Sequence, residues 1–245
     1  MINMLSITDT GLRRSSNQDT YALSSGGSPV WAFVCDGMGG HAGGNIAAET
    51  AREILARSFE GGLRPNMSER AVRLLMETAV ENAHAAIYRL AGVQPELRGM
   101  GTTVVAAALL GSSLYLCHAG DSRAYLLREG TATPLTKDHS VVQRLIDEGE
   151  ITPKQALTHP ERHFITKALG VHSDPIQPDF GAHILRPGDM LLLCSDGLHG
   201  LVPAEELCGL CETAIQQGSA QPLADRANSL GGTDNITAVL LYGID

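Results

Sequence analysis

Apolar residues follow a helical spacing in one long stretch before residue 100. From Ser68 to Ala91 they recur every three or four positions, at Val72, Leu75, Met76, Ala79, Val80, Ala83, Ile87 and Leu90. This spacing predicts an amphipathic helix, and Ser68 is suited to cap its first turn. An Ala-rich pattern predicts a shorter helix over about 44–58, ended by Gly61 and Gly62.

Shorter apolar runs predict strands on both sides of this helical stretch. They cover residues 2–8, 20–24, 30–35, 102–110, 114–119, 123–128, 182–186, 189–194 and 236–242. Several runs, such as TTVVAAALL, MLLLC and ITAVLL, are apolar without alternation, so both faces of those strands should be buried. The Gly-Ser and Gly-Asp connections after residues 110 and 119 are short, and we expect them to join antiparallel neighbours.

The pattern predicts an α+β fold in which two mostly antiparallel sheets pack together and helices cover them outside. A polar and mostly helical segment over about 137–170 interrupts the strands and is expected at the surface. A further helical region is predicted over about 203–230. The chain has no repeats or linkers, which favours a single domain over residues 1–245.

Composition narrows the function. The net charge of −9 disfavours nucleic-acid binding, and no apolar run approaches the ~20 residues of a spanning helix, so no membrane insertion is expected. The N-terminus lacks a signal-peptide layout, which predicts a cytoplasmic protein. Cys35, Cys117 and Cys194 lie in apolar runs and are expected to be buried thiols. The Cys208-x-x-Cys211 pair could be redox-active, but it has no second pair for zinc and no thioredoxin-like βαβ context, so it too is expected to be structural.

Acidic residues at strand ends carry the candidate chemistry. Within VCDGMGGHAGG, residues 34–44, Asp36 ends an apolar strand beside bare glycine backbone. Similar carboxylates stand beside chain-bending residues at Asp19, Asp121, Asp196 and Asp234. If the strand ends meet, these like charges need cations between them. Two divalent ions bridged by one carboxylate would meet that need and would activate a water. Without a His/Cys cluster of ligand spacing, Mg²⁺ or Mn²⁺ is favoured over Zn²⁺.

Other interpretations of the same residues are weaker. The glycine loop fits the dinucleotide pattern G-x-G-x-x-A, but Asp36 would face a pyrophosphate and Glu60 follows a helical segment instead of a second strand. No Gly-Lys-Ser/Thr follows, which excludes a P-loop. Ser195 lacks the first glycine of a nucleophile elbow. Arg14 could offer a bidentate fork to phosphate oxygens or could be a solvated loop arginine.

Eight segments together carry a family resemblance. They are GLRRSSNQD (11–19), VCDGMGGHAGG (34–44), MGTTVV (100–105), HAGDSRAYLL (118–127), LTKDHS (135–140), HPERHFITKALG (159–170), CSDGLHG (194–200) and GGTDNIT (231–237). In this order they resemble the bacterial branch of the metal-dependent protein phosphatases, the PPM family or type-2C serine/threonine phosphatases. The resemblance implies a four-layer α-β-β-α sandwich with the metals at one edge of the sheets.

The resemblance also implies roles for particular residues. Asp36 would bridge two metals, the Gly37 carbonyl would bind the second, and Asp196 and Asp234 would bind the first. Asp19 would hold metal-bound water, and Asp121 would bind a third, weaker ion. Arg14 would bind the phosphate, and segment 137–170 would be the flap beside the substrate groove.

Two departures from the eukaryotic pattern concern the proton donor and the metal site. Met38 stands where eukaryotic members carry the histidine that is their usual candidate acid, and Gln18 replaces a metal-associated glutamate. His41 is the nearest titratable replacement, although a loop hydrogen bond would explain it as well. His118, His139, His163 and His199 are interpreted as structural or flap residues.

The function implied is hydrolysis of phosphoserine and phosphothreonine in proteins by a metal-activated water, without a phosphoenzyme. The expected partners are phosphorylated proteins and a cognate Ser/Thr kinase, with secretion-system regulators among the candidates, and the expected state is a monomer. The alternative is a non-catalytic phosphatase-like scaffold that binds phosphoproteins. The presence of all the carboxylates disfavours the scaffold.

Overall fold

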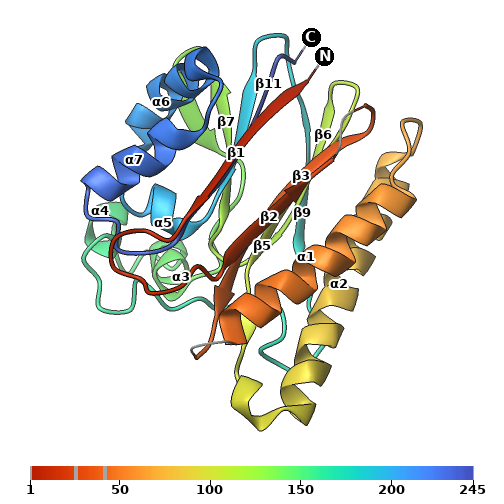
Figure 1. Cartoon of the computed structure of the whole chain (residues 1–245), viewed down its shortest axis with the longest axis vertical. Coiled ribbons are helices and arrows are strands. Elements are labelled where there is room, and N and C mark those ends of the chain that lie inside the picture. The colour runs from red at the N-terminus through yellow and green to blue at the C-terminus, as the bar shows by residue number, and fades with distance from the viewer. Residues whose placement is uncertain (1, 25–26, 41–42, 245) are drawn as a thin grey trace.

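The computed structural model describes residues 2–24, 27–40 and 43–244, and these form the four-layer α+β sandwich that the sequence predicts (Figure 1). One sheet has the order β1-β11-β10-β7-β8. Its strands are β1 (Asn3–Asp9), β7 (Arg123–Arg128), β8 (Thr131–Pro134), β10 (Met190–Cys194) and β11 (Ile236–Tyr242). The facing sheet has the order β2-β3-β5-β6-β9, with β4 paired to β3. Its strands are β2 (Asp19–Leu23), β3 (Val30–Met38), β4 (Gly101–Thr102), β5 (Val104–Leu110), β6 (Ser113–Ala119) and β9 (Asp179–Ile184).

Helices cover the outer faces of both sheets. The covering helices are α1 (Gly43–Gly62) and α2 (Glu69–Val93) on one sheet, and α6 (Ala204–Gln217) and α7 (Gln221–Ser229) on the other. The remaining short helices are η1 (Pro95–Leu97), α3 (Val141–Asp147), α4 (Pro153–Ala156) and α5 (Asp196–His199). The orange and yellow helices α1 and α2 lie along the sheet that contains β3, and the blue helices α6 and α7 lie along the other sheet (Figure 1). Ser68 caps α2 by accepting a hydrogen bond from the Ala71 amide, as predicted.

The core has three layers because the strands bury both faces. In β5, Val104 and Ala106 pack toward α1 and α2, whereas Val105 and Ala107 pack between the sheets. A third cluster lies between the other sheet and α6 and α7. Since successive side chains point to opposite faces, two covered faces produce the uninterrupted apolar runs.

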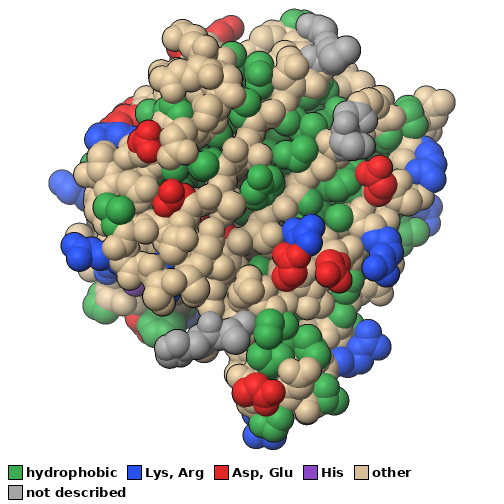
Figure 2. All heavy atoms as spheres, in the orientation of Figure 1, with side chains coloured by type: hydrophobic (Ala, Val, Ile, Leu, Met, Phe, Trp, Pro, Cys, Tyr) green, Lys and Arg blue, Asp and Glu red, His purple; other side chains and the backbone are tan. Residues whose placement is uncertain are grey.

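The two edge strands β1 and β2 lie side by side across the gap between the sheets (Figure 1). Partly buried Met4, Tyr21 and Leu23 pack there against the inter-sheet core. Figure 2 shows hydrophobic side chains gathered along the middle of this face, with charged side chains mainly toward the helices. Among the described residues, no helix has the length and apolar character that crossing a membrane requires.

The structure corrects the expectation for the connection after residue 119. The Gly-Ser link joins antiparallel neighbours β5 and β6, but the Gly-Asp link carries the chain from β6 in one sheet to β7 in the other. Gly120 adopts a φ of +115°, a left-handed conformation that glycine tolerates without a Cβ clash. The prediction of a hairpin was therefore wrong, and Asp121 lies at a crossing between the sheets.

The segment 137–170 is also less helical than expected. Its described helices are α3 and the single turn α4, and turns and bends make up most of the remainder. The strand expected over 182–186 starts earlier, at Asp179. All five cysteines are free and buried, as expected of structural thiols.

Candidate metal centre and active site

Strand ends from both sheets bring the predicted carboxylates together. Asp19 begins β2 and pairs in register with Asp36 on β3. Asp121 follows β6, Asp196 begins α5 directly after β10, and Asp234 precedes β11. A cleft of about 520 Å³ is lined by Arg14, Gln18, Asp36, Gly37, Met38, Gly39, Thr103, Asp121, Arg162, His163, Ile165, Asp196, Thr233, Asp234 and Asn235. Four of the five carboxylates thus face one cleft.

The electrostatics of the cluster favour neutralisation. Burial raises the pKa of Asp36 well above its usual value, and the charge of Asp19 raises it further. Burial likewise raises the pKa of Asp19 to about 7, although a hydrogen bond from Ser195 opposes the shift. Burial, reinforced by Asp196, raises the pKa of Asp121 to about 7. Without a cation the folded protein therefore holds protons on these carboxyl groups near neutral pH.

Two further observations are consistent with a divalent ion bound by this cluster. Asp196 Oδ1 is buried and has no hydrogen-bond partner among the described residues, and burial followed by the charge of Asp234 raises the pKa of Asp196. At Gly37 a Cβ would collide with the Gly44 carbonyl oxygen and lie 2.6 Å from the Gln18 carbonyl oxygen. Only glycine fits there. Carboxylate and carbonyl oxygens are the ligands that Mg²⁺ and Mn²⁺ prefer.

Arg14 lies in the cleft beside the carboxylates. Its Nη2 donates to Asp234 Oδ2 at 2.6 Å, and about half of the Arg14 side chain is exposed. The ion pair places a guanidinium, with donors to spare, within reach of a phosphate that enters the cleft. It also occupies an oxygen of a predicted metal ligand, a contact that sequence reasoning did not anticipate.

Buried side chains that sequence reasoning did not single out hold these loops in place. The Ser195 hydroxyl donates to Asp19 Oδ2 at 2.7 Å, and Thr103 Oγ1 accepts from the Asp36 amide at 3.0 Å. Asn235 Oδ1 accepts from the Gln18 amide, and its Nδ2 donates to the carbonyl oxygens of residues 10 and 16. Each of the three lies inside one of the segments that carry the family resemblance, but nothing in the sequence indicated its hydrogen-bond partner.

Histidines occupy several positions around the site. His41, the candidate proton donor, lies outside the described residues. His199 donates through Nε2 to the Asp121 carbonyl oxygen at 2.9 Å, and burial lowers its pKa to about 4. From the flap, His163 and Arg162 line the cleft. His199 was expected to be a structural or flap residue, and its hydrogen bond to the Asp121 carbonyl oxygen agrees with a structural role.

A second hollow of about 500 Å³ adjoins the cleft on the side of the flap. The two share the residues Asp121, Arg162, His163, Asp196, Thr233 and Asp234. Apolar side chains line the flap side of this hollow, at Val142, Ile146, Pro153, Ala156 and Leu157. The combination of a charged cleft and an adjoining apolar hollow can hold a phosphorylated side chain together with flanking residues of a peptide.

One other group has a spacing that could hold a metal ion. His118, His139 and Asp179 each offer a ligand atom, and these atoms lie within 4.8 Å of one another. The cluster stands at the edge of the sheet formed by β6 and β9, where His118 and Asp179 are paired in register.

Comparisons with known proteins agree with this geometry. A family model described as protein phosphatase 2C matches residues 12–234. A protein from Streptococcus pyogenes named "Putative protein phosphatase 2C-type" is 37% identical over 96% of this chain and 95% of its own. A solved serine/threonine phosphatase of S. agalactiae is 34% identical, with a TM-score of 0.90 over 99% of both chains. The catalytic domain of the phosphatase PstP, solved with two manganese ions, is 35% identical, with a TM-score of 0.84 over 100% of this chain and 99% of that one.

Proposed function

The chain belongs to the protein phosphatase 2C family and is a metal-dependent serine/threonine protein phosphatase, and from this premise we propose which of its residues perform the reaction. One observation carries the assignment. Asp36, Asp121, Asp196 and Asp234 come from distant parts of the sequence and line one cleft together with Arg14.

We assign Asp36, Asp196, Asp234 and the Gly37 carbonyl as the groups that would hold two divalent ions: Asp36 would serve both, Asp196 and Asp234 the first, and Gly37 the second. The unpartnered Asp196 Oδ1 and the raised pKa of Asp36 support this arrangement. When bound, two such ions lower the pKa of a water that they hold, so that it can act as a nucleophile near neutral pH. Asp19, which is paired in register with Asp36 on the neighbouring strand, would hold a water of the metal site.

Arg14 supplies the phosphate contact in this proposal. Its Nη2 donates to Asp234 Oδ2 at 2.6 Å, and its remaining donors would bind phosphate oxygens. Asp121 is assigned to a third, weaker ion. His41 is proposed as the donor of the proton that the serine or threonine alkoxide needs on leaving.

The substrates are phosphorylated proteins, and a Ser/Thr kinase is the class of enzyme that makes them. We therefore propose that the phosphatase opposes a Ser/Thr kinase of the same cell, with regulators of secretion among the candidate substrates. A phosphoproteome compared with and without the gene, and restored by wild type but not by Asp36→Asn, tests this. Sites that rise only in the absence of active enzyme identify the substrates.

The catalytic assignment is tested with the purified protein. We expect turnover of a phosphothreonine peptide and of an aryl phosphate with Mn²⁺, loss of both with a chelator, and recovery when Mn²⁺ is restored. The matched control is Asp225→Asn, which removes an exposed carboxylate on α7. A folded wild type that binds phosphopeptides without turning them over would instead support the scaffold alternative.

A further inference from the structure

His139 is joined twice to the residue before Asp121. The His139 amide donates to the Gly120 carbonyl oxygen at 3.0 Å, and the Gly120 amide donates back to His139 Nδ1 at 3.1 Å. Gly120 packs closely against Thr103, because a Cβ at Gly120 would lie 2.6 Å from the Thr103 side chain. The residue that leads into Asp121 is therefore held on both sides by His139: the imidazole binds its amide, and the backbone amide of His139 binds its carbonyl oxygen.

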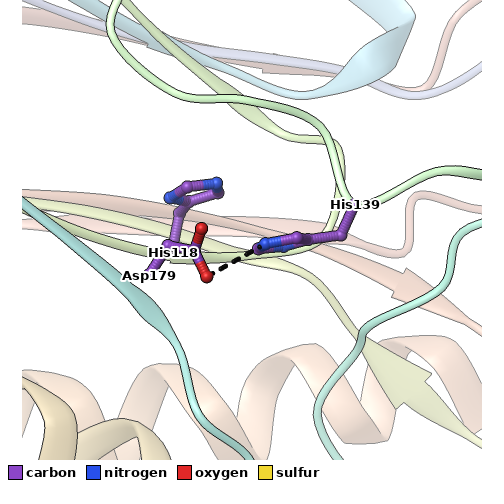
Figure 3. Close-up of side chains that lie close together, drawn as sticks. All are labelled: His118, His139 and Asp179. Atoms are coloured by element: carbon purple, nitrogen blue, oxygen red, sulfur yellow. Dashed lines mark ion pairs between the residues drawn. The ribbon is translucent and has the colours of Figure 1, made fainter. Parts of the chain in front are cut away.

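The imidazole itself is held in one orientation. Its Nε2 lies 3.2 Å from Asp179 Oδ1, and its ring stacks on His118 with the centroids 4.7 Å apart. Figure 3 shows the His139 ring reaching toward Asp179, with His118 beside them. His118 is fixed in turn, since its Nε2 donates to the Lys137 carbonyl oxygen at 2.9 Å. Burial and the neighbouring His118 and Lys167 lower the pKa of His139 to about 4, so the ring is neutral near pH 7.

The neutral ring has one arrangement that satisfies both contacts. Nδ1 accepts from the Gly120 amide, so the proton lies on Nε2 and is donated to Asp179. A metal at Nε2 would need that proton removed and Nδ1 protonated, which would break the bond from Gly120. Lys167 Nζ already lies 2.8 Å from Asp179 Oδ1 as its cationic partner. The contacts thus satisfy the ligand atoms of this cluster within the protein.

His139, near the start of the flap, also connects the loop that carries Asp121 to the end of the flap. Its carbonyl oxygen accepts from the Thr166 amide at 2.7 Å, and the next residue, Ser140, pairs with Ile165 across the base of the flap. One residue therefore contacts the Asp121 loop, the flap and the edge strand β9.

We propose that His139 is a positioning residue whose Nδ1 holds the Gly120 amide, and so fixes the residue before Asp121 and prepares the Asp121 carboxylate to bind a divalent ion. The inference rests on the proposed role of Asp121 as a metal ligand. Residues that orient metal ligands from behind typically alter metal affinity by about 10- to 100-fold. We expect an effect of that size on the ion bound by Asp121, with little change for the ions bound at Asp36.

The experiment uses two amide substitutions that separate the ring nitrogens. In His139→Asn the amide oxygen stands near the position of Nδ1 and can accept from Gly120, whereas in His139→Gln the amide lies near the position of Nε2. Calorimetric titration of Mn²⁺ into the metal-free proteins measures the number and affinity of bound ions directly. Thermal unfolding of the same samples reports on folding, and His183→Ala on β9 is the matched control.

We expect His139→Ala and His139→Gln to weaken the Asp121-dependent Mn²⁺ site by about 10- to 100-fold. His139→Asn should restore most of the affinity, and His183→Ala should leave it unchanged. In an Asp121→Asn background, His139→Ala should cause no further loss, because the two residues act on the same ion.

Three results would overturn the inference. One is a loss in His139→Asn as large as that in His139→Ala, and another is an additive loss in the Asp121→Asn background. The third is a tight Mn²⁺ or Zn²⁺ equivalent that persists in Asp121→Asn and disappears with His139→Ala, since the cluster would then itself bind the metal. If Asp121→Asn left Mn²⁺ binding unchanged, the assignment of Asp121 would fail first, which is distinguishable from a failure of His139 alone.

Discussion

Mn²⁺ binding should strengthen steeply with pH, because the carboxylates that receive the ion hold protons in the metal-free fold. Burial and Asp196 raise the pKa of Asp121 to about 7, and burial and Asp19 raise that of Asp36 still more clearly. A metal can bind these groups only after they lose their protons. Raising the pH from 6 to 8 is therefore the perturbation, and the Mn²⁺ dissociation constant is the quantity measured.

The magnitude follows from the two pKa shifts. A carboxyl group with a pKa of about 7 is about nine-tenths protonated at pH 6 and about one-tenth protonated at pH 8. Asp121 alone then strengthens binding of its ion about tenfold over this interval. Asp36, whose pKa is raised well above the usual value, adds a further factor in the same direction for the ions that it bridges.

In the metal-free protein these carboxyl groups make the folding stability decrease as the pH rises, whereas Mn²⁺ binding strengthens. A carboxyl group whose folded pKa is raised stabilises the fold at low pH, and that contribution is lost as the pH rises from 3.8 toward about 7. The lowered pKa values of His139 and His199, about 4, oppose this trend between pH 4 and 6.5. The stabilisation by Mn²⁺, taken as the difference between samples with Mn²⁺ and with chelator, should therefore grow with pH.

Calorimetric titrations of Mn²⁺ at pH 6, 7 and 8 and constant ionic strength make the measurement. In Asp121→Asn, the tenfold increase in Mn²⁺ affinity between pH 6 and 8 that Asp121 contributes should be lost. In Asp225→Asn, the Mn²⁺ affinity should change with pH as it does in the wild type. An affinity that is independent of pH in the wild type, or a slope unchanged in Asp121→Asn, would refute the assignment of raised carboxyl pKa values to the metal cluster.

Further predictions concern the chemistry at the cleft. Asp36→Asn and Asp234→Asn should each lose most turnover at limiting Mn²⁺ while remaining folded by circular dichroism, because removing a like charge relieves the metal-free cluster; near-wild-type turnover would contradict the ligand assignment. Arg14→Ala should raise KM for a phosphopeptide about 12- to 160-fold, which corresponds to about 1.5–3 kcal/mol for a charged hydrogen bond, while Arg13→Ala does not; loss of Mn²⁺ binding would argue against a phosphate role. His41→Ala should cost up to about 10²–10⁴-fold on a phosphothreonine peptide and much less on an aryl phosphate, whose leaving group needs no proton; equal losses would indicate a role in the loop or the metal site.

The carboxylates could be found from the sequence because each follows or precedes a strand that the sequence shows plainly. The strand over 236–242 was predicted at its observed bounds, Ile236–Tyr242. The strand before Asp196 ends at Cys194, as predicted, whereas the strand expected to stop at Asp36 continues to Met38. Alternating and continuous apolar patterns are local properties of the chain, so they can be recognised without knowing which strands pair with each other.

Features that depend on contacts between distant residues could not be found in this way. Ser195 reaches Asp19 across 176 positions of sequence, and the chain after Gly120 crosses between sheets where a hairpin was expected. The flap pattern suggested more helix than formed, because its polar residues have few buried apolar contacts to stabilise it.

The sequence by itself therefore determined the two-sheet architecture, the family and the five carboxylates. Buried strands require apolar residues and a metal site requires acidic ones, so both can be recognised from the residue types along the chain. The tertiary structure decided which carboxylates share a cleft, that Arg14 pairs with Asp234 and that the His139 ring holds the Gly120 amide. Those relations arise from the packing of one sheet on the other, which brings together groups that the sequence keeps far apart.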